Sequence, residues 1–89
     1  MKKRDMSGKT VMITGASRGI GEATARVFAE AGANVALLAR SVDEIAQTAG
    51  EIGRSAIAIP CDVSRRSAVE AAVAATARTF GGLDVLIGN

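Results

Sequence analysis

The sequence predicts an α/β fold in which a parallel sheet carries helices on both faces. Four short, continuous apolar runs occur along the 89 residues, at 11–13, 35–39, 56–59 and 85–87. Continuous apolar strands are typical of a parallel sheet that is buried on both sides. Amphipathic helical patterns fill the three intervals between the runs, and parallel strands need such long crossover connections. The alternation therefore predicts a doubly wound parallel sheet.

The composition is that of a globular chain and excludes several classes of protein. Apolar residues make up 48% and charged residues 22% of the sequence. No run of about 18 apolar residues is present, so no membrane span is expected. The net charge of +2 is dispersed along the chain, which argues against a nucleic-acid partner. Residues 1–8 form a basic tail without the apolar segment of a signal peptide, so a cytoplasmic protein is expected.

Cysteine and histidine usage narrows the chemistry further. Cys61 is the only cysteine, so no intrachain disulfide can form, and we expect it to be a small buried residue at a strand end. The chain contains no His, which removes the commonest zinc ligand and the commonest general base. No metal site is therefore predicted.

The first helix is predicted over residues 19–31, directly after the first strand and a glycine-rich turn. Charged residues occupy one face of this helix, and Gly32 ends it. Its apolar stripe is expected to consist of Ile20, Ala23, Val27, Phe28 and Ala31.

Two further helices are predicted over residues 42–52 and 65–80. Ser41 is the expected N-cap of the second helix and Ser64 that of the third.

Right-handed crossovers place the first two helices on one face of the sheet and the third on the other. The strand order becomes 3-2-1-4, the first half of a doubly wound nucleotide-binding fold. A ligand is expected at the carboxyl ends of the strands, where the first and fourth strands diverge.

The turn between the first strand and the first helix has the design of a phosphate cradle. Backbone N–H groups at a helix start lack partners within the helix, and the helix dipole makes that end positive. We expect Gly15 to allow the tight turn, Gly19 to let a ligand approach the backbone, and Gly21 to let helix and strand pack closely. An ordinary turn is the alternative interpretation. The candidate cofactor-binding residues here are Gly15, Ser17, Arg18, Gly19, Ile20 and Gly21.

Preceded by Thr14, this Gly-x-x-x-Gly-x-Gly spacing resembles the motif of the short-chain dehydrogenases/reductases. It differs from the Gly-x-Gly-x-x-Gly fingerprint of the long-chain dehydrogenases. The resemblance extends from about Gly8 to Asn89. It implies a Rossmann-type fold, a nicotinamide dinucleotide cofactor, a small carbonyl or alcohol substrate and a homo-oligomeric full enzyme.

Two arginines predict NADP(H) rather than NAD(H). Ala39 stands where an NAD site would place an acidic residue on the ribose 2′-hydroxyl, and Arg40 follows it. Together with Arg18 in the glycine turn, Arg40 is expected to converge on a 2′-phosphate. In the resembling family a basic residue at either position accompanies NADP(H). For either arginine alone, a solvated surface charge is the alternative.

The resemblance implies cofactor contacts at two more strand ends. Asp62 matches the family's Asp that accepts a hydrogen bond from the adenine amino group, and Val63 would pack near the ring. Capping of the third helix is the alternative role for Asp62. The family continues its fourth strand with Asn-Asn-Ala-Gly; here Gly88 replaces the first Asn and Asn89 matches the second. Disorder at the chain end is the alternative for Asn89.

No catalytic residue is assigned within these 89 residues. The family uses a Ser and a Tyr-x-x-x-Lys beyond the fourth strand, and the chain contains no Tyr. We therefore expect a truncated chain that ends inside its domain. It would hold the adenosine-phosphate half of the site of an NADP(H)-dependent oxidoreductase and be inactive alone. The alternatives are a non-catalytic dinucleotide-binding module and a structural fragment that binds nothing.

Overall fold

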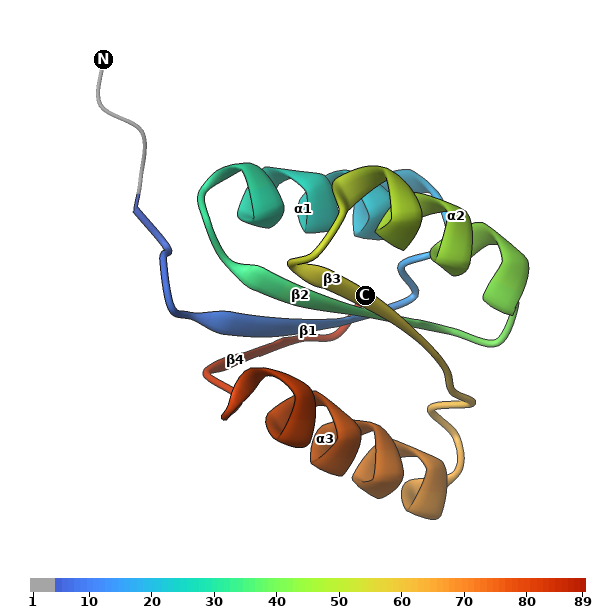
Figure 1. Ribbon diagram of the computed structural model, residues 1–89. Coiled ribbons are helices and arrows are strands. Elements are labelled where there is room, and N and C mark those ends of the chain that lie inside the picture. Colours follow the sequence, from blue (N-terminus) through green and yellow to red (C-terminus); the bar gives the residue numbers. More distant parts are fainter. Residues whose placement is uncertain (1–4) are drawn as a thin grey trace.

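A parallel sheet between two layers of helices makes up the computed structural model, which describes residues 5–89 (Figure 1). The strands are β1 (Thr10–Thr14), β2 (Asn34–Ala39), β3 (Ala56–Pro60) and β4 (Val85–Ile87). The helices are α1 (Gly19–Glu30), α2 (Val42–Ile52) and α3 (Arg66–Phe80). The basic tail predicted for residues 1–8 lies partly outside the described residues.

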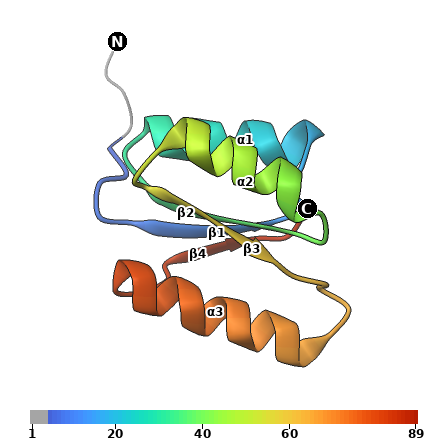
Figure 2. The same cartoon turned by 45° about the vertical axis from the view of Figure 1, so that its right-hand side comes forward.

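The strand order is β3-β2-β1-β4, and every pairing is parallel, as the sequence predicted. Val11 of β1 lies opposite Val35 of β2 on one side and Val85 of β4 on the other. Helices α1 and α2 cover one face of the sheet, while α3 covers the other (Figures 1 and 2). This is the layout that right-handed crossovers impose.

The two central strands explain why their apolar runs are continuous. Val11 and Ile13 of β1 belong to the core beneath α1 and α2, and Met12 belongs to the core beneath α3. Leu37 and Leu38 of β2 divide between the two cores in the same way. Successive side chains of a strand point to opposite faces, so a strand covered on both sides must be apolar throughout.

Helix α1 buries a different face from the predicted stripe. Gly21 and Ala25 are its buried residues, whereas Ile20 is 76% and Val27 is 64% exposed. A Cβ atom at Gly21 would lie 2.1 Å from the carbonyl oxygen of Gly15, so the start of the helix touches the end of β1. Such a close approach is possible only if the smallest residues face the sheet. The larger apolar residues are therefore turned outward, although Phe28 still packs on the core.

Neither predicted serine cap forms. Ser41 occupies the N-cap position of α2, but its side chain makes no capping hydrogen bond. Helix α3 begins one residue later than predicted, with Arg65 as its N-cap. The hydroxyl of Ser64 donates instead to Asp62 Oδ1 at 2.7 Å, which keeps it from the helix end. The expected cap at Ser64 was therefore wrong.

Strand β4 forms one edge of the sheet, and its Leu86 side chain is 55% exposed.

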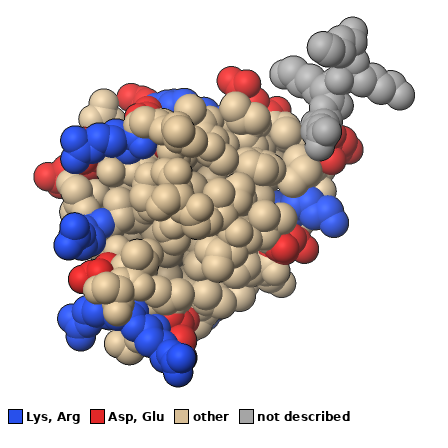
Figure 3. All heavy atoms as spheres, turned by 180° about the vertical axis from the view of Figure 1, so that it is seen from behind, with Lys and Arg blue, Asp and Glu red and all other residues tan. Residues whose placement is uncertain are grey.

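Figure 3 views the molecule from the side opposite to Figure 1, and this surface has a broad uncharged area with charged side chains around its margin. Over residues 5–89, no helix has the length and apolar character needed to cross a membrane.

Candidate functional site

A hollow of about 350 Å³ opens at the carboxyl ends of the strands, where the sequence places the ligand. Its walls come from the turn after β1 and from the segments that follow β2 and β3. The hollow is lined by Gly15, Arg40, Cys61, Asp62, Val63 and Ser64. Four predicted cofactor residues, distant in sequence, are thus brought together: Gly15, Arg40, Asp62 and Val63.

The glycine turn is anchored to the sheet and leaves open space on its outer side. The N–H of Ala16 donates to the carbonyl of Leu38 at 3.0 Å, which extends the β1–β2 pairing into the turn. Gly19 has φ of +61°, and a Cβ atom there would meet nothing within 4 Å. Arg18 is the N-cap of α1 and makes no side-chain capping hydrogen bond. The start of α1 therefore has no side-chain cap and lies beside open space, as the binding of an anionic group to a helix N-terminus requires.

The end of β4 is tied to the same turn by Asn89. Its side-chain Nδ2 donates to the Gly15 carbonyl at 3.2 Å, and its backbone N–H donates to Thr14 Oγ1 at 3.0 Å. The Thr14 hydroxyl donates in turn to the carbonyl of Ile87 at 3.4 Å. Asn89 is therefore tied to the turn through both its side chain and its backbone. Sequence analysis missed the role of Thr14, although its place directly before Gly15 was a usable signal.

Asp62 presents an ionised carboxylate to the hollow. Its Oδ1 accepts hydrogen bonds from the hydroxyl of Ser64 at 2.7 Å and from the N–H of Ser64 at 3.0 Å. These two bonds, assisted by the charges of Arg40 and Arg65, hold the pKa of Asp62 below its ordinary value. Because the side chain bonds Ser64 and no side chain caps α3, the alternative role of Asp62 as a helix cap is wrong.

Exposed apolar side chains lie beside these polar groups. Val63 lines the hollow and is 57% exposed, which leaves an apolar surface next to Asp62. Ile20 stands in the first turn of α1, also exposed. Cys61, by contrast, is a buried free thiol at the floor of the hollow, in the place expected for a small buried residue.

The two arginines have different neighbours. Arg40 is exposed and lines the hollow with Asp62. The Arg18 side chain is 81% exposed, and its Nη2 lies 4.0 Å from Glu44 Oε1 in the first turn of α2. No contact brings the two guanidinium groups of the described structure together. Ser17 belongs to a second hollow, of about 280 Å³, whose other lining residues are Glu22, Arg26, Glu44, Gln47, Thr48 and Glu51.

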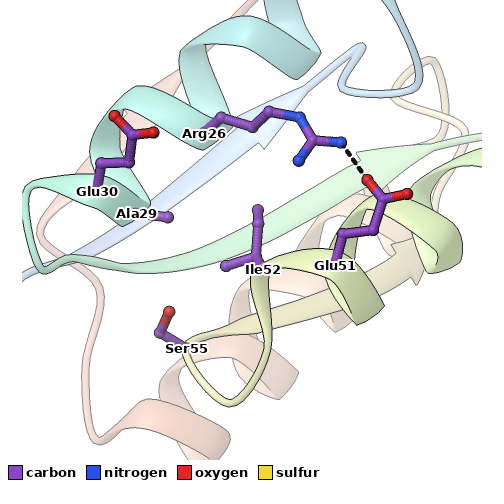
Figure 4. Close-up of a pocket in the computed structure, with 6 residues that line it drawn as sticks. All are labelled: Arg26, Ala29, Glu30, Glu51, Ile52 and Ser55. Atoms are coloured by element: carbon purple, nitrogen blue, oxygen red, sulfur yellow. Dashed lines mark hydrogen bonds and ion pairs between the residues drawn. The ribbon is translucent and has the colours of Figure 1, made fainter.

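A third hollow lies between α1 and α2, and an ion pair across it joins the two helices. Figure 4 shows Arg26 reaching from α1 to Glu51 of α2, an ion pair of 2.6 Å. Arg26 also binds Glu22 on its own helix at 3.0 Å, and it holds the pKa of Glu51 below its ordinary value. None of the predicted site residues lines this hollow, which is formed by Arg26, Ala29, Glu30, Glu51, Ile52 and Ser55.

Proteins similar in sequence to this chain are known. The family model described as short chain dehydrogenase matches residues 9–89. Oxidoreductase UcpA of Salmonella typhimurium is 48% identical over 87 residues, which cover 94% of this chain and 33% of that protein. Sorbitol dehydrogenase of Cereibacter sphaeroides is 38% identical, with 94% of this chain and 33% of the relative covered.

Comparison of structures agrees with the comparison of sequences. The 3-ketoacyl-(acyl-carrier-protein) reductase of Brucella melitensis, solved in complex with NADH, superposes with a TM-score of 0.87 at 42% identity. The match covers 90% of this chain and 33% of that reductase. The chain thus spans about one third of the length of the relatives it matches. With its parallel 3-2-1-4 sheet and its Thr-Gly-x-x-x-Gly-x-Gly turn, the chain belongs to the short-chain dehydrogenase/reductase family.

Proposed function

We propose that the protein is an NADP(H)-dependent oxidoreductase that acts on a small carbonyl or alcohol substrate. Residues 5–89 would supply the adenosine-phosphate half of its cofactor site. The observation that carries this proposal is the hollow at the carboxyl ends of β1 to β3, which joins the glycine turn to Arg40, Asp62 and Val63. A relative that was solved with NADH has the same fold at 42% identity, which supports a nicotinamide dinucleotide.

The residues present fit such a cofactor. The open space at Gly19 and the uncapped start of α1 suit a pyrophosphate, because unpaired N–H groups and the helix dipole both attract negative charge. The carboxylate of Asp62 can accept a hydrogen bond from the adenine amino group, and Val63 offers an apolar surface to the ring. When bound, the nicotinamide would supply the hydride chemistry, for which residues 1–89 offer no assigned catalytic group.

The preference for NADP(H) is proposed from charge. Ala39 at the end of β2 carries no carboxylate that could accept a hydrogen bond from a ribose 2′-hydroxyl. Arg40, exposed in the hollow, and Arg18, exposed in the glycine turn, could instead bind a 2′-phosphate. Hydrogen bonds between a guanidinium group and a phosphate are among the stronger polar contacts in proteins, at about 1.5–3 kcal/mol each.

The test is Arg40→Ala in the intact protein, with binding of NADPH and NADH measured by fluorescence titration. Loss of the contact should weaken NADPH binding about 10- to 150-fold and leave NADH binding nearly unchanged. Arg54→Ala is the matched control, because Arg54 is exposed and lies outside all three hollows described above. Equal losses for the two cofactors would refute the 2′-phosphate role. Binding of neither cofactor by the unmutated protein would refute the function.

A converse variant adds the missing carboxylate. Ala39→Asp should shift the preference toward NADH, because the new charge repels a 2′-phosphate and can accept a hydrogen bond from a 2′-hydroxyl. The ratio of the two dissociation constants is the quantity to compare. A ratio that stays the same, in a variant that still folds, would contradict the assigned position of the ribose.

A further inference from the structure

We propose that Glu44 is a specificity-determining residue that limits how strongly the site prefers NADP(H). Its carboxylate would act as the counter-ion of Arg18 until a 2′-phosphate takes its place. The inference rests on the function proposed above and adds a residue to which that function assigned no role. Its starting observation is the 4.0 Å approach of Glu44 Oε1 to Arg18 Nη2.

The position of Glu44 links α2 to the glycine turn. Glu44 stands in the first turn of α2, the helix that follows directly on Arg40 and the end of β2. It lines the same hollow of about 280 Å³ as Ser17, the neighbour of Arg18 in the turn. The carboxylate of Glu44 therefore places a negative charge beside the glycine turn, where we propose that a phosphate binds.

The other carboxylates of this hollow already have a cation. Glu22 and Glu51 bind Arg26 at 3.0 Å and 2.6 Å, whereas Glu44 makes the contact with Arg18. Among the ion pairs of residues 5–89, this contact is the one that includes Arg18. A change at Glu44 should therefore act on the glycine turn and leave the ion pairs of Arg26 with Glu22 and Glu51 intact.

The geometry of the pair makes it exchangeable. Both side chains are well exposed, at 81% for Arg18 and 45% for Glu44, and 4.0 Å is a long contact. Exposed ion pairs of this kind hold weakly because water and salt screen them. A phosphate near Arg18 would compete for the guanidinium group and would be repelled by Glu44. A cofactor with a 2′-hydroxyl carries no charge at that place, so Glu44 should weaken NADPH binding selectively.

The experiment compares Glu44→Gln with Asp43→Asn in the intact protein. Both variants remove one negative charge from the first turn of α2 and so share any effect on the helix dipole, but only Glu44 contacts Arg18. We expect Glu44→Gln to tighten NADPH binding about two- to fivefold at low salt and to leave NADH binding unchanged. The gain should disappear in high salt. Asp43→Asn should leave the ratio of the two dissociation constants as it is.

A double-mutant cycle tests whether Glu44 acts through Arg18. In an Arg18→Ala background, Glu44→Gln should lose most of its gain, because the competition for the guanidinium group no longer exists. An undiminished gain in that background would overturn the counter-ion role. An equal gain with Asp43→Asn, or an equal gain for NADH, would overturn the specificity role.

The inference and the proposed function fail in different ways. If the unmutated protein prefers NADPH and Arg40→Ala removes that preference, the proposed function stands; an unchanged ratio in Glu44→Gln then rejects the inference alone. If the unmutated protein shows no preference between NADPH and NADH, the NADP(H) proposal fails first.

Discussion

Two parts of the site are built in contrasting ways. The inner joint, which consists of Thr14, Gly15, Gly21 and Asn89, is held by backbone contacts and hydrogen bonds between β1, α1 and β4. The outer rim consists of Arg18, Arg40, Asp62 and Val63. It carries exposed charges and one exposed apolar side chain. The joint holds the glycine turn in position, and the rim provides the side chains that a ligand would contact.

This difference separates stability from ligand choice. At Gly21 in the joint, space for a side chain is absent, so the fold dictates the residue: a Cβ atom there would meet Gly15 and also Asn89. On the rim, the side chains of Arg40 and Val63 are exposed, so the fold should tolerate other residues there. Substitutions at the joint should therefore destabilise the protein, whereas substitutions on the rim should change its cofactor preference.

The largest effect is expected from Gly21→Ala. The new methyl group would lie 2.1 Å from the Gly15 oxygen, so α1 must move away from β1. We expect the free energy of unfolding to fall by about 3 kcal/mol, measured by urea denaturation. Gly50→Ala in α2 is the matched control, because a Cβ atom there meets nothing within 4 Å. It should raise stability by up to about 1 kcal/mol through helix propensity. A Gly21→Ala protein as stable as the unmutated one would show that the joint is not tight.

Much of the fold, and less of the joint, could be predicted from the sequence. The strand order followed from the continuous apolar runs and the handedness of crossovers, both of which are local patterns with a general rule behind them. The buried face of α1 was mispredicted because periodicity favours the largest apolar residues, Ile20 and Val27. The contact at Gly21 instead selects the smallest.

Long-range hydrogen bonds account for what the sequence did not reveal. Asn89 and Gly15 are 74 positions apart, and no spacing rule connects them before the sheet is assembled. The Ser64 hydroxyl had two acceptable partners, a helix end and a carboxylate, and only the structure shows that it donates to Asp62. Glu44 fitted the positive end of α2 as well as any acidic residue would, so its contact with Arg18 gave no signal in the sequence.

A second test of the joint is Asn89→Ala, with a smaller effect. It removes the Nδ2 hydrogen bond to Gly15 but keeps the backbone bond to Thr14. The free energy of unfolding should fall by about 0.5–1.5 kcal/mol in urea denaturation. Asn89→Asp should cost more than Asn89→Ala, because a carboxylate cannot donate to the Gly15 carbonyl and is repelled by it. An Asn89→Ala protein as stable as the unmutated one would show that this hydrogen bond does not contribute to stability, and equal stabilities of the two variants would show that the carboxylate is not repelled.

Stability measurements on the rim sharpen the contrast. Arg40→Ala, which is expected to weaken NADPH binding strongly, should change the free energy of unfolding by less than about 0.5 kcal/mol, as is usual for exposed positions. The urea midpoint and the NADPH dissociation constant are to be measured on the same preparation. A large loss of stability would place Arg40 with the joint and undo the division between the two regions.

The smallest effect on stability is expected from the hydrogen bonds between Asp62 and Ser64. The hydrogen bonds from Ser64 lower the pKa of Asp62 in the folded protein, so the folded state binds its proton less readily than the unfolded chain does. The resulting stabilisation is present above the unfolded pKa of about 3.9 and is lost as the pH falls through the lower folded value. Ser64→Ala removes the hydroxyl donor, which is the largest cause, and keeps the N–H donor. The pKa of Asp62, followed by NMR of its carboxyl carbon, should therefore rise toward its ordinary value without reaching it. An unchanged pKa would mean that the Ser64 hydroxyl does not lower it, and that the retained N–H donor and the charges of Arg40 and Arg65 hold the carboxylate ionised.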